Sequence, residues 1–328
     1  MYRMNKELII RSGSDAVDFA LLKDGKKYFL DGTEKYNSFG EYAQRIQGKE
    51  VLIEDGDKYI LAKIPVQKAA SNTEKSTINY VIENETLKGK VKMEYLGESR
   101  ASFLYNYNSI KNDKKEDALK WYLNSKDKNC TVSNIKTSDL LNRDQKLTLD
   151  YDVAIANHVS SFDNEIYVDL NYNKEYNSFD FKERKTDFLL SYKSFDDITI
   201  SLQIPEGYKV SKMPENISII TDDYSILMKY EVKGNTLIYT KQFQFKNGII
   251  KSSKFSDWKN HYDKIQKNYS VALKVYNQLQ LISASKLLVT YINALGGSNK
   301  KIYFNRFGLH SMPSMLIGRV LRNEVPRW

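Results

Sequence analysis

The stretch Lys26–Gly40 (KKYFLDGTEKYNSFG) places a carboxylate where it could do chemistry. Residues 27–30 have the composition of a short strand, and Gly32 and Thr33 mark the turn that follows. Asp31 therefore occupies the last position of the predicted strand. A carboxylate in such a turn commonly accepts a hydrogen bond from the backbone two residues further on. The residues alone predict that Asp31 is a turn former.

Catalysis by a cysteine requires a thiolate, an imidazole that accepts its proton and a carboxylate that orients the imidazole. The chain has one cysteine, Cys130, and its three histidines are His158, His261 and His310. Cys130 follows a predicted helix with no histidine nearby in sequence, so we predict an inert thiol. His261 lies near Trp258 on a predicted helix, which indicates a partly buried packing residue. His310 precedes Ser311, but the chain has no Gly-x-Ser-x-Gly elbow that would support a hydrolase.

One run of oxygen-bearing side chains has the spacing of a calcium loop. Its members are Asp169, Asn171, Asn173 and Glu175. Lys174 stands where such a loop requires glycine, and Asp180 stands where it requires a bidentate glutamate. We therefore interpret the run as solvent-facing strand residues. No metal site and no cofactor is expected, since a phosphate loop and a dinucleotide fingerprint are also absent from the sequence.

The hydrophobic pattern predicts a mainly β protein. Apolar residues alternate in residues 78–82, 91–95, 103–107, 147–155, 166–172, 198–204, 228–232 and 237–245. Asp-Gly pairs at residues 24–25 and 55–56 predict two further hairpins. Many strands with one apolar face are typical of an antiparallel β-sandwich. We expect two peripheral helices: residues 112–125, capped by Asp113 with Trp121 and Tyr122 in the buried stripe, and residues 253–275.

The positive charge lies mostly at the C-terminus. Residues 277–328 carry seven basic residues against one acidic residue, whereas residues 1–276 carry 43 against 40. The main body is therefore not expected to bind nucleic acid. The tail aromatic residues Tyr303, Phe304, Phe307 and Trp328 could stack on bases or lie on an anionic membrane, but we favour an unstructured or weakly packed tail. Neither a signal peptide nor a run of about 18 apolar residues is recognisable.

Four segments together resemble a known family. These are Lys26–Gly40, Gly48–Pro65, Asp196–Ile217 and Ser256–Ser270. They resemble the end of the transglutaminase-like catalytic core, and the C-terminal uncharacterised domain, of large envelope proteins of Bacteroidetes-type bacteria, over about residues 16–273. The resemblance implies that Asp31 is the third member of a Cys-His-Asp triad. In the family the cysteine and histidine precede this Asp, but Ser12–Phe19 holds no histidine, so Asp31 is a stranded carboxylate that is not competent alone.

The resemblance implies three regions. Residues 1–66 are a β-hairpin remnant of the core, residues 67–276 a β-sandwich domain of uncharacterised function, and residues 277–328 a basic helical or disordered tail. We expect a fragment without enzymatic activity of its own, located in the periplasm or cell envelope, which acts as an accessory or interaction domain. Its expected partner is the missing core, or an envelope peptide or glycan. The alternative is a cysteine-dependent peptidase or acyl transferase completed by another polypeptide.

Overall fold

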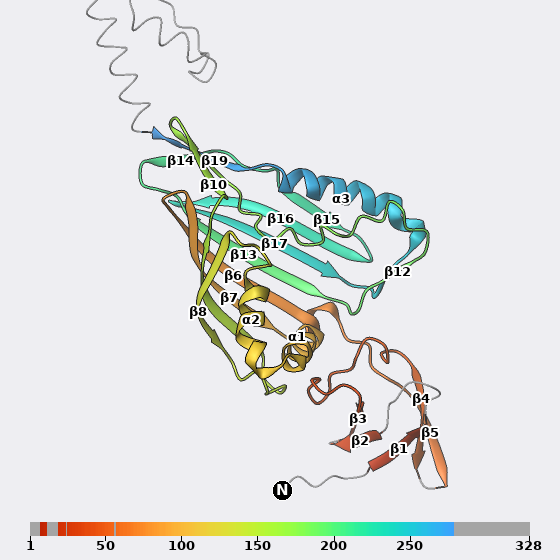
Figure 1. Cartoon of the computed structure of the whole chain (residues 1–328). Coiled ribbons are helices and arrows are strands. Elements are labelled where there is room, and N and C mark those ends of the chain that lie inside the picture. The colour runs from red at the N-terminus through yellow and green to blue at the C-terminus, as the bar shows by residue number, and fades with distance from the viewer. Residues whose placement is uncertain (1–6, 12–18, 24, 56, 279–328) are drawn as a thin grey trace, which may run out of the picture. The chain divides into compact units, whose positions relative to one another are not determined.

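The computed structural model describes residues 7–11, 19–23, 25–55 and 57–278 (Figure 1). The chain divides into two compact units, residues 1–278 and residues 279–328. The second unit, with His310, Ser311 and the tail aromatic residues, lies outside the described residues. Within the described part, no helix is long and apolar enough to cross a bilayer.

The N-terminal part of the first unit is a five-stranded antiparallel sheet with the order β3-β2-β1-β4-β5. Its strands are β1 (Glu7–Arg11), β2 (Phe19–Lys23), β3 (Lys26–Leu30), β4 (Glu50–Asp55) and β5 (Lys58–Lys63). Both predicted hairpins are confirmed, because β2 pairs with β3 and β4 pairs with β5. The sheet has a separate hydrophobic cluster that includes Phe29, Ile46 and Ile53. The two predicted hairpins thus form one sheet, in which β1 pairs with β2 on one side and with β4 on the other.

The main sheet has eight strands in the order β15-β16-β17-β13-β6-β7-β9-β8. They are β6 (Thr73–Glu83), β7 (Thr86–Tyr95), β8 (Cys130–Thr137), β9 (Leu147–Ile155), β13 (Phe195–Gln203), β15 (Ile217–Ile220), β16 (Tyr224–Lys233) and β17 (Thr236–Phe245). The mainly β fold is confirmed. The sheet is mixed, however, because β13 pairs with β6 in parallel while the other neighbours are antiparallel. Alternation within a strand does not reveal the direction of its neighbour.

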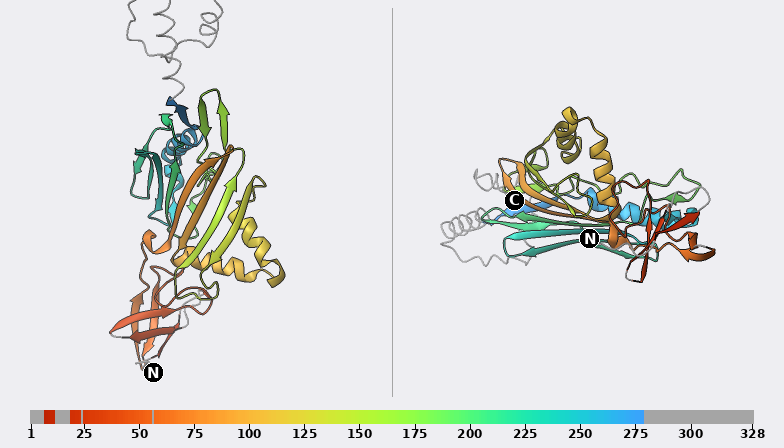
Figure 2. Two further views of the ribbon diagram at one scale, coloured as in Figure 1. Left: turned by 90° about the vertical axis from the view of Figure 1, so that its left-hand side faces the viewer. Right: turned by 90° about the horizontal axis from the view of Figure 1, so that it is seen from below.

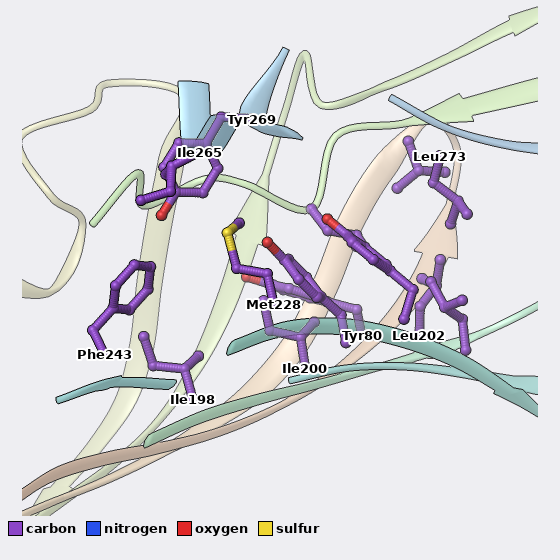
Figure 3. Close-up of a cluster of buried hydrophobic side chains, with 14 of the residues drawn as sticks. Tyr80, Ile198, Ile200, Leu202, Met228, Phe243, Ile265, Tyr269 and Leu273 are labelled. Atoms are coloured by element: carbon purple, nitrogen blue, oxygen red, sulfur yellow. The ribbon is translucent and has the colours of Figure 1, made fainter. Parts of the chain in front are cut away.

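One face of the main sheet is buried. Along β17 every second residue is buried, so its odd-numbered side chains point into the core. A four-stranded sheet, β10-β11-β19-β14, and the helix α3 (Phe255–Tyr269) share this core. The smaller strands are β10 (Val159–Phe162), β11 (Glu165–Val168), β14 (Tyr208–Lys212) and β19 (Leu273–Asn277), with β12 (Phe188–Leu189) pairing with β18 (Ile249–Ile250). Figure 3 shows Ile265 and Tyr269 of α3 facing Phe243 and Met228 of the main sheet.

Two further helices, α1 (Gly97–Ser109) and α2 (Lys115–Leu123), lie on one side of the main sheet (Figure 2, right). The strand predicted at residues 103–107 is wrong, because these residues belong to α1. Phe103 and Tyr107 are one helical turn apart and stack with their ring centroids 6.1 Å apart, while Tyr105 is 65% exposed. The three aromatic residues fit the period of a strand, but Phe103 and Tyr107, four residues apart, also fit the period of a helix, which is the structure that forms.

The helix predicted at residues 112–125 is confirmed in its position but not in its details. A 3-10 turn (Asn112–Lys114) precedes α2, and Lys114, not Asp113, occupies the cap position without a side-chain hydrogen bond. The buried residues are Leu119 and Leu123, whereas Trp121 is 54% exposed. The predicted helix at residues 253–275 ends at Tyr269, and the chain then enters β19. Further 3-10 turns span Ala69–Asn72 and Ser252–Lys254.

Candidate functional site

Asp31 forms a hydrogen-bonded turn at the end of β3. The backbone amide of Thr33 donates to its Oδ1 at 3.0 Å, and the hydroxyl of Thr33 donates to the same oxygen at 2.7 Å. The guanidinium of Arg45 forms an ion pair with Oδ2. The turn-former prediction is confirmed. Both carboxylate oxygens have partners from the same N-terminal region, and no histidine is among these partners.

Cys130 is the first residue of β8 and belongs to the main core, where it is 4% exposed. Burial raises the pKa of its thiol. The hydroxyl of the neighbouring Tyr172 donates its hydrogen to the carbonyl oxygen of Asn124. The ring of His158 packs edge-on against Tyr172, with centroids 5.6 Å apart. His158 uses its Nδ1 toward the carbonyl oxygen of Asp169, at 3.1 Å. Nδ1 of the imidazole is thus engaged with Asp169, and a buried thiol with a raised pKa is a poor nucleophile.

The other residues with candidate chemistry have structural partners. His261 contacts Tyr224, whose hydroxyl lies 2.9 Å from Nδ1, and burial lowers the pKa of this imidazole. The prediction of a packing histidine is confirmed.

The run from Asp169 to Glu175 follows β11 and is not the solvent-facing strand that we predicted. Asp169 accepts the amide of Asn171 at 2.8 Å, and Asn171 is 3% exposed and accepts the hydroxyl of Tyr239 at 3.1 Å. Through these hydrogen bonds, the oxygens of Asp169 and Asn171 hold the loop against the core. In the part of the chain that is described, no group of three or more His, Cys, Asp or Glu side chains could hold a metal ion.

The structure instead brings two acids together inside the main domain. Glu74 of β6 and Asp196 of β13 are paired residues of the parallel ladder. They line a cavity of about 210 Å³ on the buried face of the sheet, together with Glu175 and Lys241. Burial is the main cause that raises the pKa of Glu74 to about 8, with a smaller contribution from repulsion by Asp196 and Glu175. Burial likewise raises the pKa of Asp196 to about 6.

One lysine supplies the positive charge of this cavity, and it is already paired. The Nζ of Lys241 lies 2.6 Å from Oε2 of Glu175 and donates to the carbonyl oxygen of Asn173 at 3.1 Å. The side chain of Lys241 is only 2% exposed, so this is a buried ion pair. Asp196 accepts a hydrogen bond from Tyr176. Among the described residues no Lys or Arg forms an ion pair with Glu74, so its carboxyl group favours the neutral form at neutral pH.

This acidic pair was not predicted from the sequence, although a signal was present. Glu74 has the same parity as Ser76, Ile78 and Tyr80, and Asp196 the same parity as Ile198, so both acids are in phase with an apolar face. An acid in phase with the core side of a strand indicates a buried carboxyl. What the sequence could not give is the parallel pairing of strands 120 residues apart, which places the two acids side by side.

Three comparisons with known proteins bear on this fold. Residues 164–273 match a family described as a domain of unknown function with a solved structure, DUF3858. No curated protein matches the chain. Among solved structures, the chain is similar to a protein of Parabacteroides distasonis whose description assigns it provisionally to the proteases, with 11% identity and a TM-score of 0.40. The similarity covers 82% of this chain and 39% of that protein, so this chain spans less than half of its length.

Proposed function

We propose that this chain is a non-catalytic accessory or interaction module that acts beside a transglutaminase-like core in a cell-envelope protein. The observation that carries the proposal is the state of the two residues that such chemistry would use. Oδ1 of Asp31 accepts hydrogen bonds within its own turn, and Oδ2 forms an ion pair with Arg45. Cys130 is buried in the separate main core, with its pKa raised. A triad requires these groups to meet at one accessible imidazole.

Contacts between the N-terminal region and the main domain support the role of an accessory module. Arg100 of α1, which is 4% exposed, forms an ion pair with Glu41 and donates to the hydroxyl of Ser38 at 2.9 Å. The backbone amide of Gln44 donates to Glu98 at 2.7 Å. The segment that carries Asp31 is therefore connected to α1 by charged hydrogen bonds. A core that docks on this segment would be connected through it to the main domain.

The proposed location is the periplasm or the cell envelope, and the proposed partner is the transglutaminase-like core or an envelope peptide or glycan. The support is the sequence resemblance over residues 16–273, which includes the region matched by the DUF3858 family. The function of that family is not assigned, so the partner is named by the resemblance alone.

The test mixes the purified chain with a separately produced transglutaminase-like core that carries its own cysteine and histidine. We expect a complex in size-exclusion chromatography and the same amide turnover with wild-type chain and with Asp31→Asn. The variant keeps an acceptor oxygen for the amide of Thr33 and removes the charge that Arg45 pairs with. Absence of a complex would contradict the accessory role. Turnover that appears on mixing and is lost in Asp31→Asn would show instead that the chain completes a cysteine-dependent enzyme.

A further inference from the structure

A second cavity adjoins the acidic pair and shares Glu74 with it. It has a volume of about 360 Å³ and lies among α1, α2 and the end of the main sheet. Six of its lining residues are aromatic: Tyr95, Phe103, Tyr107, Trp121, Tyr122 and Tyr192. Glu74 is the acidic residue of the lining, and the remaining polar groups are Ser99, Ser102 and Asn106. The cavity therefore combines aromatic walls with one carboxyl group.

The carboxyl group lies at the inner end of this cavity. Glu74 is paired in the ladder with Tyr95, which is 1% exposed, whereas Trp121 and Tyr122 are 54% and 45% exposed and form the outer part. The hydroxyl of Tyr95 lies 3.0 Å from the hydroxyl of Tyr122 and 3.5 Å from Sδ of Met93. Glu74 and Tyr95 are neighbours in the ladder and line the same cavity, so the carboxyl group lies beside the aromatic side chains.

We infer that this aromatic cavity binds an organic cation, an alkylammonium group whose charge meets Glu74 and whose carbon atoms contact the surrounding rings. Among the described residues no Lys or Arg forms an ion pair with Glu74, so its carboxyl group is available to pair with the positive charge of a ligand. Aromatic faces attract ammonium groups, most strongly where water is excluded. Two rings at the rim already bind ammonium groups of the chain. Nζ of Lys126 lies 4.4 Å from the ring centre of Trp121, and Nζ of Lys115 lies 5.2 Å from that of Tyr107.

The two rim lysines do not cancel the attraction. Their ammonium groups lie at the surface, where solvent and salt screen them, whereas Glu74 lies in a site of low dielectric constant. The groups that face Glu74 are Asp196 from β13, Glu175 from the loop before β12 and Tyr95 from β7, and Lys241 of β17 is neutralised by Glu175. A bound cation favours the ionised carboxyl, so it displaces the proton that the empty site holds near neutral pH.

The inference goes beyond the proposed function, because it holds whether or not the chain acts beside a catalytic core. Isothermal titration calorimetry at pH 7 with n-butylammonium tests it, and 1-butanol serves as the neutral probe of equal shape. We expect one site for the cation, with heats that depend on the ionisation enthalpy of the buffer because protons are released. We expect 1-butanol to bind on the order of tenfold more weakly. Equal binding of the two probes, or no binding of the cation, would overturn the inference.

Variants locate the binding. Glu74→Gln keeps the shape of the side chain and removes its charge. We expect this variant to bind butylammonium on the order of tenfold more weakly and to release no proton on binding. Trp121→Ala removes an exposed ring, and we expect it to lower the affinity for butylammonium without affecting folding. Glu116→Gln is the matched control, since Glu116 lies on α2, is 80% exposed and does not line the cavity. Unchanged affinity in both Glu74→Gln and Trp121→Ala would refute the assignment.

Discussion

The buried carboxyl of Glu74 predicts an unusual dependence of stability on pH. Its pKa is about 8 in the folded chain, against an ordinary value of 4.5. Between these two values the folded state holds a proton that the unfolded state has released. The free energy of unfolding therefore falls as pH rises through this window, by up to about 1.4 kcal/mol per pH unit from this residue alone.

The variant Glu74→Gln removes this dependence. Glutamine resembles the protonated acid in shape and carries no charge, so we expect wild type and variant to have similar stability at pH 5. The variant should become more stable than wild type as pH rises, with a relative gain of about 3.5 kcal/mol between pH 5 and pH 8. Asp196, with a pKa of about 6, makes the free energy of unfolding fall with rising pH in a lower range of pH, and it is present in both proteins.

Urea unfolding followed by tryptophan fluorescence, at intervals of half a pH unit, measures the effect. Glu116→Gln, at a side chain that is 80% exposed, is the control and should follow the pH dependence of wild type. A constant difference in stability between Glu74→Gln and wild type across the range would contradict the prediction. It would mean that Glu74 is ionised in the folded chain and that a positive charge stabilises it there.

Two further predictions concern how the elements are joined. Gly97 has φ +56°, and a Cβ there would lie 2.3 Å from backbone and side-chain oxygens, whereas Gly234 has φ +58° with open space around it. We expect Gly234→Ala to lower the free energy of unfolding in urea by about 1 kcal/mol, and Gly97→Ala to lower it by at least about 3 kcal/mol. Similar costs would contradict the close approach at Gly97. Arg100→Ala leaves Glu41 without its buried partner and should cost about 3 kcal/mol, with faster proteolysis of residues 31–45; a loss below about 1 kcal/mol would show that the ion pair is exposed to solvent.

The sequence predicted most of the fold because the strands carry a clear period of two. The pattern was correct at β9, where Leu147, Leu149 and Ile155 are all buried. It failed at residues 103–107, because Phe103 and Tyr107, four residues apart, also share one face of a helix, on which Tyr105 has no place. The parallel contact of β6 with β13 was also out of reach, since it depends on long-range pairing.

The candidate site was predicted only in part. The turn at Asp31 is a local effect, and local chemistry identified it correctly. The raised pKa of Glu74 depends on burial and on Asp196 and Glu175, and its cavity is lined by rings of α1 and α2. Asp196 and Glu175 are more than 100 residues away in the sequence, and α1 and α2 come after β7 in the chain. The same is true of the contact of Tyr172 with Cys130. Burial and neighbouring charge set the properties of these groups, and both arise only from the tertiary structure.

We propose that Cys130 does not act as the nucleophile of a cysteine-dependent enzyme in this chain alone, and thiol labelling tests this proposal most directly. The folded chain is incubated with iodoacetamide at pH 7, and the mass of the intact protein is compared with that of a sample labelled in urea. The burial of Cys130 predicts a single adduct in urea and none in the folded chain on the same time scale. Rapid labelling of the folded chain, slowed in His158→Ala, would contradict the account, because it would show an accessible thiolate activated by an imidazole.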